Sequence, residues 1–448
     1  MVMDELGAYC AAQGSTVLSD EVSHHAVRAV VDWMAATIAG GVMSPATNLT
    51  RAFVDDRGGN CELIPSGRRT DVRTAALING SAAHTAELDD IFRDGLYHPG
   101  APTIAAALAT AQDRGTDGAA FLRAVVAGFE VSTRIATIIN PSHYRNWHTT
   151  GTVGTIGAAA AVATLLGLDA KAAGHAIASS VTMAAGLQQA FRSDAMSKPL
   201  HAGHAAEAGA IAAFGAEEGL TGAWDILEGE RGFGAAMSDD PDWSDAFAGL
   251  GSSFNITRMT FKNHAACGHT FAAIDAVLDL RDRFGLGPDD ADRIRVSTYR
   301  TALEVAGNPD PKTEFEAKFS LPYCLAVALT DGSVRLRAFE DDRLESPAIR
   351  ELMGRIEVDV DDDLDAAFPA QRGARVMIDF GDGRTETSLA RTRKGDPDDP
   401  LTDDDITGKL IEVGQSGMGA DGVRELGDRL WALAALDDMA TLVVADEG

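Results

Sequence analysis

Nine of the eleven histidines lie between His84 and His269, and several stand beside Gly, Pro or Thr. Imidazole can take and give protons near neutral pH. Lys198, one of only seven lysines, and the acidic run Glu87-Leu88-Asp89-Asp90 fall in the same span. A single histidine is more often a core or cap residue, so the cluster as a whole carries the inference of acid–base chemistry on an anionic substrate. The nine are His84, His98, His143, His148, His175, His201, His204, His264 and His269.

The first two segments of interest are His84 to Asp90 and the turn at His98-Pro99. A residue before proline favours extended backbone, which can project the His98 ring into a cavity. Glu87, Asp89 and Asp90 follow a helical pattern and could orient a histidine or coordinate a metal ion. No H-E-x-x-H or EF-hand pattern accompanies them, so the sequence predicts no metal.

His148-Thr149-Thr150 stands directly before a long apolar helical pattern from Gly151 to Leu166. Free N–H groups at a helix start bind carboxylate or phosphate, and His148 could donate to the same anion. The alternative is simple capping of the helix by Thr149 or Thr150. The contexts of His98 and His148 suit a cleft better than a core, so their replacement by Gln is expected to leave thermal stability nearly unchanged.

Lys198 precedes Pro199, with His201 and His204 close behind. Because a residue before proline is disfavoured in a helix interior, we expect Lys198 in a loop, where its ammonium could meet a substrate carboxylate. An ordinary exposed lysine is the alternative.

A fourth segment contains Lys262, His264, Cys267 and His269 and lies where the helical pattern gives way to a mixed one. Binding sites favour domain interfaces. Cys267 with two histidines suggests a thiol nucleophile or a zinc site, but a second Cys or an acid at ligand spacing is missing. The chain also lacks the glycine-rich dinucleotide and phosphate-loop motifs and the G-x-S-x-G motif of hydrolases.

Composition narrows the class of protein. A chain of 448 residues exceeds the usual size of one core, so two domains are expected. The formal net charge of −29 repels nucleic acid and anionic membranes, and an anion pocket would have to reverse that sign locally. Four cysteines without a CxxC pair predict no disulfide framework. Neither a signal peptide nor a membrane span is visible, which favours the cytoplasm.

The elements that must position these residues change along the chain. Residues 20–260 show helical spacing of apolar positions, rich in Ala. Alternating strand patterns occupy 294–299, 356–360, 375–380 and 385–389, with helical patterns at 272–283 and 320–329. Residues 403–440 are helical again. The sequence predicts a mainly α protein with a smaller α+β part: a helical bundle domain over 1–265 and 400–448, and an α+β domain over 266–399.

Seven strings in order resemble the MmgE/PrpD family, which includes 2-methylcitrate dehydratase, cis-aconitate decarboxylase and iminodisuccinate epimerase. The resemblance runs from about residue 20 to about residue 440. The strings are Asn79-Gly80 with His84 and Leu88-Asp89-Asp90; His98-Pro99; His148-Thr149-Thr150-Gly151-Thr152; Lys198-Pro199-Leu200-His201-Ala202-Gly203; Gly232-Phe233-Gly234; Cys267-Gly268-His269-Thr270 through Ile274-Asp275-Ala276; and Lys318-Phe319-Ser320-Leu321-Pro322-Tyr323.

The resemblance implies a helical domain built from both ends of the chain, an α+β lid domain, a homodimer, and an interdomain active site that needs no metal or organic cofactor. By motif match, the catalytic groups are His98, His148, Lys198, His269 and Tyr323. The matched substrate-binding groups are Glu87, Asp89, Thr149, Thr150, His201, Lys262, His264 and Cys267.

The chain departs from the family pattern at several positions. Glu87 stands where decarboxylase-like members carry Asp, and Ile91 stands where they carry Thr. A histidine used by some members falls at Cys267 or Phe271, so His264, Cys267 and His269 all stay candidates.

The family's activities share the formation of a carbanion next to a carboxylate. The sequence therefore predicts a cofactor-independent lyase, foremost a hydro-lyase, acting on a small di- or tricarboxylic acid. An epimerase or isomerase, a decarboxylase, a metalloenzyme using His and Asp, and a non-catalytic member that keeps the fold are the alternatives.

Overall fold

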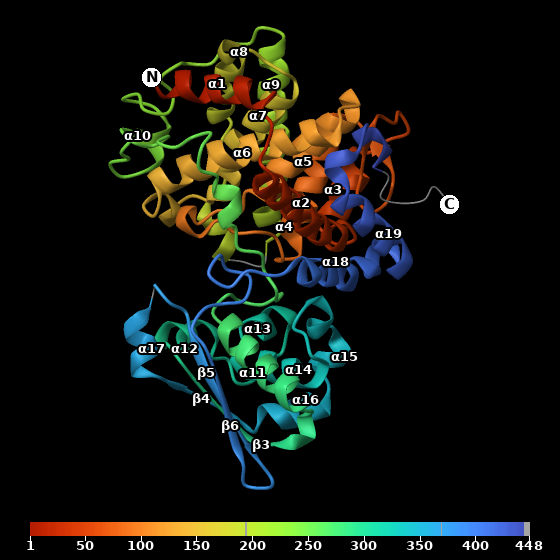
Figure 1. Ribbon diagram of the computed structural model, residues 1–448, viewed down its shortest axis with the longest axis vertical. Helices are drawn as coiled ribbons and strands as arrows, with labels where there is room; N and C mark the ends of the chain where they lie inside the picture. Colours follow the sequence, from red (N-terminus) through yellow and green to blue (C-terminus); the bar gives the residue numbers. More distant parts are fainter. Residues whose placement is uncertain (193–194, 369, 443–448) are drawn as a thin grey trace. The chain divides into compact units, whose positions relative to one another are not determined.

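The computed structural model describes residues 1–192, 195–368 and 370–442. The chain splits into two compact units: unit 1 is Met1–Phe261 with Thr402–Gly448, and unit 2 is Lys262–Leu401. The described residues confirm a mainly helical protein with a smaller α+β part (Figure 1).

The described residues of unit 1 form mainly helices, with one two-stranded ladder of β1 (Cys61–Glu62) and β2 (Arg69–Thr70). Its α-helices are α1 (Val2–Gln13), α2 (Asp20–Gly41), α3 (Ala46–Phe53), α4 (Val72–Thr85), α5 (Gly100–Arg114), α6 (Gly118–Ile139), α7 (Thr149–Leu165), α8 (Ala170–Val181), α9 (Ser197–Glu217), α10 (Phe233–Met237), α18 (Asp403–Met418) and α19 (Ala420–Trp431). Its 3₁₀ turns are η1 (Arg93–Gly95), η2 (His143–Arg145), η3 (Gln188–Arg192), η4 (Asn255–Arg258), η7 (Leu433–Ala435) and η8 (Met439–Thr441).

Helix α7 forms the centre of unit 1 and packs against α5, α6, α8 and α9. Residues 149–164 are all buried, which explains why the helix is apolar nearly all round. Small residues let the neighbouring helices approach closely. At the contact of α4 with α9, a Cβ added at Gly203 would overlap the carbonyl oxygen of Leu77 and the hydroxyl of Ser81. This approach brings the carboxyl end of α4 toward the beginning of α9.

The C-terminal segment completes unit 1, because α18 packs along α2. Thr402 begins α18 with a capping box in which its hydroxyl accepts from the Asp405 N–H and the Asp405 carboxylate accepts from the Thr402 N–H. The helical pattern predicted at 403–440 is confirmed as α18 and α19, followed by two short 3₁₀ turns.

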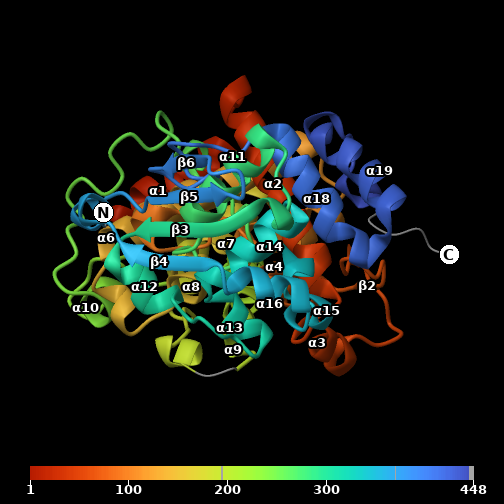
Figure 2. The same ribbon diagram turned by 90° about the horizontal axis from the view of Figure 1, so that it is seen from below.

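Unit 2 contains one four-stranded sheet in the order β4-β3-β5-β6, formed by β3 (Ala291–Thr298), β4 (Ile356–Val360), β5 (Ala374–Phe380) and β6 (Thr385–Ala390). Strands β3 and β4 are parallel, while β5 is antiparallel to both β3 and β6. Figure 2 shows the four strands side by side. The burial of β5 alternates strictly, as its sequence predicts for a sheet with one face on a core.

Helix α11 of unit 2 packs against β5, β6 and α14. The α-helices of this unit are α11 (Phe271–Phe284), α12 (Arg300–Ala306), α13 (Glu314–Lys318), α14 (Leu321–Asp331), α15 (Asp341–Leu344), α16 (Pro347–Met353) and α17 (Asp362–Ala367). Its 3₁₀ turns are η5 (Pro288–Asp290) and η6 (Leu336–Phe339).

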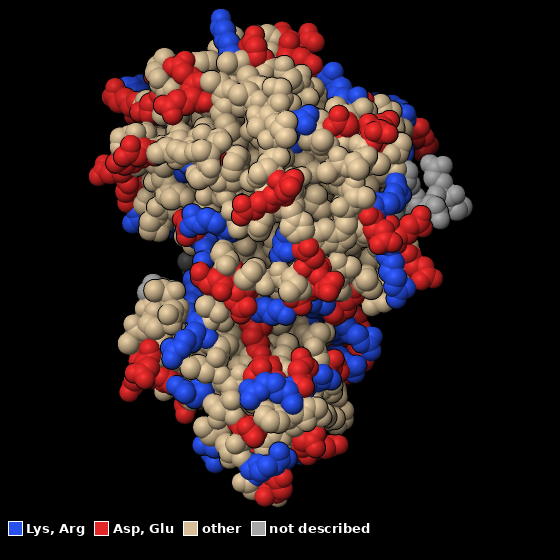
Figure 3. Space-filling model, in the orientation of Figure 1, with Lys and Arg blue, Asp and Glu red and all other residues tan. Residues whose placement is uncertain are grey.

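Acidic side chains are spread over the face drawn in Figure 3, with Lys and Arg interspersed among them. Within the described part of the chain, no single helix combines the length and mean hydropathy of a membrane span; α2 and α3 reach them only as a pair bent by 71°.

Candidate active site

Four helix ends of unit 1 carry most of the predicted site residues. His84 lies in the last turn of α4, and His98 lies just before α5. His148 is the N-cap of α7, while Lys198 and His201 occupy the first turns of α9. The His84 ring is 4.8 Å from the His98 ring and stacks on His148 at 5.3 Å, measured between centroids. Tertiary packing therefore gathers imidazoles from α4, α7 and the segment before α5 into one cluster.

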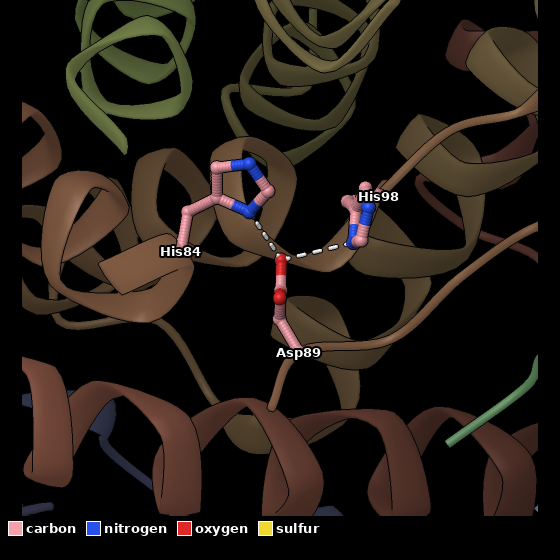
Figure 4. A group of neighbouring side chains, drawn as sticks. All are labelled: His84, Asp89 and His98. Atoms are coloured by element: carbon pink, nitrogen blue, oxygen red, sulfur yellow. Dashed lines mark hydrogen bonds and ion pairs between the residues drawn. The ribbon is translucent and has the colours of Figure 1, made fainter. Parts of the chain in front are cut away.

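Asp89 links two of these imidazoles (Figure 4). Its Oδ2 accepts a hydrogen bond from His84 Nδ1 at 2.6 Å and lies 3.2 Å from His98 Nδ1, a contact between a carboxylate and an imidazole. Asp89 and His84 are fully buried, while His98 keeps 16% of its side chain exposed. The carboxylate faces the Nδ1 edge of His98 and so orients that ring.

The same three side chains have the composition of a metal-ligand set, with their ligand atoms all within 4.8 Å of one another. Two ligands of one tetrahedral zinc ion at about 2.0–2.1 Å from it lie about 3.3 Å apart. The 2.6 Å separation of His84 Nδ1 and Asp89 Oδ2 is shorter and fits a hydrogen bond. The three side chains therefore form a hydrogen-bonded network.

His148 and His201 form a second pair, in which their Nδ1 atoms lie 3.1 Å apart. One of the two nitrogens must carry the proton of this hydrogen bond and the other must accept it. Burial, and then the nearby His84, lowers the pKa of both rings: that of His201 to about 4, and that of His148 well below its usual value. Both imidazoles are therefore neutral at pH 7.

Lys198 supplies the cation of the cluster. Its ammonium pairs with the Glu87 carboxylate and lies 5.2 Å from the centre of the Phe191 ring. The Phe191 ring also meets His148 edge-on at 4.7 Å. The expectation that Lys198 lies in a loop is wrong, because it is the second residue of α9. Proline is tolerated in a first helical turn, where N–H groups have no intrahelical partner.

Thr149 and Thr150 are fully buried at the start of α7, and neither is its N-cap. His148 is the N-cap and makes no side-chain capping bond, so capping by either threonine is ruled out. The hydroxyl of Thr150 accepts from the backbone N–H of His98 at 3.3 Å, and that of Thr149 accepts from the Asn140 amide at 3.4 Å. The two hydroxyls thus hold the segment before α5 and the end of α6 against α7.

In unit 2, His264 forms a dyad with Asp275 on α11. The His264 Nε2 lies 2.8 Å from Asp275 Oδ1, and the other carboxylate oxygen accepts the Lys394 N–H at 2.8 Å. The His264 side chain is only 2% exposed. Lys262 is also buried. Asp275 therefore orients the His264 ring within this unit.

His269 lies 2.7 Å from the Tyr299 hydroxyl through Nδ1. Burial, and then Arg372 and Arg393, lowers its pKa to about 4, so the ring is neutral at pH 7. Cys267 is half-buried, and among the described residues no three-ligand group includes it. Tyr323 is fully buried and its hydroxyl donates to the Ala338 carbonyl at 2.6 Å, which ties it to the core of unit 2.

Three residues around the unit 1 cluster were not given a role in the site from the sequence. His84 belonged to a recognised string but received no role, Phe191 lies in an unpatterned stretch, and Lys409 lies in the C-terminal segment. The sequence carried a signal for two of them: His84 belongs to the histidine cluster, and Lys409 is a rare lysine on the apolar face of a helix, between Ile406 and Val413.

A separate hollow of about 340 Å³ in unit 1 is lined by residues that include Phe92, Arg134, Asn255 and Arg258. Arg134 donates to the backbone carbonyls of Ala248 and Ser253, and Arg258 pairs with Asp94. The guanidinium groups of Arg134 and Arg258 thus already bond to protein groups, and none of the predicted site residues lines this hollow. The histidine cluster is the better candidate site.

Two models of one protein family match the chain, one after the other. The model of the MmgE/PrpD N-terminal domain matches residues 4–246, and that of the MmgE/PrpD C-terminal domain matches residues 264–433. Together they cover most of the chain. The protein belongs to the MmgE/PrpD family.

The chain is similar over most of its length to curated family members. A cis-aconitate decarboxylase-like protein of Aspergillus oryzae is 27% identical, over 96% of this chain and 93% of its own. The cis-aconitate decarboxylase of Aspergillus terreus is 26% identical, over 86% and 83%. The human cis-aconitate decarboxylase is 27% identical, over 96% and 91%. These relatives support a lyase that acts on carboxylic acids and leave the reaction of this chain open.

Proposed function

We propose that this protein is a cofactor-independent lyase that acts on a small di- or tricarboxylic acid by proton transfer at a carbon next to a carboxylate. The observation that carries the proposal is the neutral His148–His201 pair. In such a pair the ring that donates through Nδ1 has a free lone pair on Nε2, and the ring that accepts carries its proton on Nε2. The pair therefore holds one base and one acid, which an elimination requires together.

Elimination of water would use both nitrogens. The basic Nε2 takes the proton from carbon, the C–H electrons form the double bond, and the hydroxyl leaves as water with the proton from the other Nε2. The proton between the two Nδ1 atoms moves to the ring that gave up its Nε2 proton, so both rings end neutral with their roles exchanged. Negative charge grows on the adjacent carboxylate in the transition state. The Lys198 ammonium and the first N–H groups of α7 would stabilise that charge. His98, oriented by Asp89, is a further base for the same proton.

Decarboxylation is the second candidate, favoured by the names of the relatives described above. Loss of carbon dioxide leaves an electron pair on carbon, which the Nε2–H protonates while water restores a proton to the pair, so no base is needed to remove a proton from carbon. The presence of both a base and an acid in the pair favours dehydration. Stereochemical inversion, in which the proton returns to the opposite face, is the isomerase alternative.

The test is proton NMR in deuterium oxide with a panel of di- and tricarboxylates. The proposal predicts deuterium uptake next to a carboxylate and the appearance of an unsaturated acid in the wild type. The Gln variants of His148 and His201 should show neither. Loss of carbon dioxide without water loss would select decarboxylation, and inversion without loss of either would select an isomerase. Absence of exchange, turnover and binding over the whole panel would identify a non-catalytic family member.

The same assay run after exhaustive EDTA treatment tests the role of Asp89. We expect full activity, because the His84–Asp89 contact has the length of a hydrogen bond. Activity lost to EDTA and restored by a divalent ion would instead make His84, Asp89 and His98 a ligand set.

The homodimer is also a proposal and rests on the family resemblance. Light scattering should give twice the chain mass of 46.9 kDa. A monomeric mass in an active preparation would refute it.

A further inference from the structure

A buried ion pair from the C-terminal segment lies against the acidic loop of the candidate site. Lys409, on α18, donates from Nζ to Asp32 Oδ1 on α2 at 2.6 Å and to the backbone carbonyl of Leu88 at 2.6 Å. The side chains of Lys409 and Asp32 are both fully buried. The ammonium thus connects two helices with the loop that follows α4.

Leu88 lies in the middle of that loop, between two residues of the proposed site. On one side, Glu87 pairs with Lys198; on the other, Asp89 contacts His84 and His98. Glu87 has φ of 56°, in the left-handed region that residues other than glycine rarely adopt. Such a conformation persists only where surrounding contacts impose it. The position of the Leu88 carbonyl therefore decides where the side chains on both sides of it point.

The loop has a second anchor at its end, where the side-chain oxygen Asp90 Oδ1 accepts from the Gly100 N–H at 3.0 Å. That contact fixes the loop to the start of α5. The Lys409 contact fixes its middle, directly after the residue in the left-handed conformation. Stability alone does not explain the ion pair, because replacing a buried pair by apolar side chains of similar volume is often neutral or stabilising.

We propose that Lys409 is a positioning residue, which holds the loop Glu87–Asp90 in the conformation that orients Lys198 and His98. The effect on turnover rests on the proposed function, whereas the effect on the loop does not. The C-terminal segment thereby contributes to the site without touching the substrate.

The test compares Asp32→Leu/Lys409→Met with the wild type. Removing both members avoids the unpaired buried charge that either single substitution would leave, and the Leu88 carbonyl loses its donor. Thr407→Val is the matched control on the same helix: among the described residues, the Thr407 hydroxyl bonds to Trp431 Nε1 and the Asp403 carbonyl and not to the Glu87–Asp90 loop. Hydrogen exchange by mass spectrometry is read on a peptide covering residues 86–92, and kcat and KM are measured on the substrate found with the panel above.

We expect the hydrogen-exchange rate of residues 86–92 to rise by about tenfold or more in the double variant and to stay at the wild-type value in Thr407→Val. We expect kcat to fall by about 10–100-fold, because small misplacement of reacting groups is costly, while KM changes little. Exchange equal to that of Thr407→Val would overturn the proposal. Faster exchange with unchanged kcat would overturn the positioning role and place the chemistry elsewhere. If the wild type itself transforms no acid, the proposed function fails, and the exchange comparison still decides whether Lys409 holds the loop.

Discussion

At the scale of single residues, substitution of Lys198 should change the catalytic rate without changing the stability of the fold. Its pair with Glu87 is partly exposed, and such pairs contribute at most about 1 kcal/mol to folding. Lys198→Ala should therefore lower kcat/KM by about 10²–10³-fold, the usual loss when a group that stabilises developing charge is removed, with little change in Tm. Lys171→Ala, at an exposed position of α8, is the control. Wild-type kcat/KM in Lys198→Ala would reduce Lys198 to a surface charge.

His148 behaves differently from what its sequence context predicts. It is buried and bonded to His201, so His148→Gln removes a buried hydrogen-bond partner, at a cost of about 1–3 kcal/mol. We expect a lower Tm together with loss of the deuterium exchange described above. His98→Gln is the comparison, because that ring is less buried and should affect Tm less. Activity of His148→Gln that merely follows its folded fraction would assign the residue to structure.

At the scale of elements, the contact of α4 with α9 decides whether the cluster assembles. Gly203→Ala would drive a methyl group into the Leu77 carbonyl and separate the helix that carries His84 from the one that carries Lys198. Overpacking of this kind costs about 1–3 kcal/mol or more. We expect a lower Tm and an activity that falls more than the folded fraction does.

The matched control for that substitution is Gly408→Ala on α18. A Cβ there meets no atom within 4 Å, and Ala is the better helix former by about 1 kcal/mol. Tm should stay level or rise, with activity unchanged. A Gly203→Ala protein as stable and active as Gly408→Ala would show that the close approach is not required.

At the scale of the whole molecule, the lowered histidine pKa values predict how stability depends on pH. The pKa is about 4 for His143, His201 and His269, against about 6.5 for histidine in an unfolded chain. Between these values the unfolded state binds protons that the folded state does not. Stability is therefore complete above pH 6.5 and falls as the pH drops toward 4, by at most about 1.4 kcal/mol per pH unit for each histidine.

Glu130 opposes this trend, because burial raises its pKa to about 7 and the folded state then keeps a proton that the unfolded state loses above about pH 4.5. One carboxyl does not outweigh three imidazoles, so the net slope keeps its sign. Urea unfolding at pH 7.5, 6 and 5 measures it. Stability that is level or rises on acidification over this range would contradict the pKa shifts.

Much of the fold could be predicted from local pattern. The strand at 356–360 coincides with β4, and the helical pattern at 272–283 lies within α11, because periods of two and of 3.6 are properties of short segments. The proline before α5 and the apolar run of α7 likewise marked two of the helix starts. Lys198 was predicted in a loop because a residue before proline is disfavoured in a helix interior. The prediction failed because Lys198 lies in a first helical turn, where that restriction is weaker.

By itself, then, the sequence determined the family, the helical and mixed parts, and the set of imidazoles, acids and lysine from which the site is drawn. It could not determine which of them pair. The bonds of His148 with His201 and of Lys409 with the Leu88 carbonyl join segments far apart in the chain, whereas Asp89 bonds to His84 only five residues before it. The Tyr323 hydroxyl donates to a carbonyl in the core of unit 2. Residue types and their order limit the available chemistry. Partners and protonation states depend on burial and distance, which only the packing of helices against one another establishes.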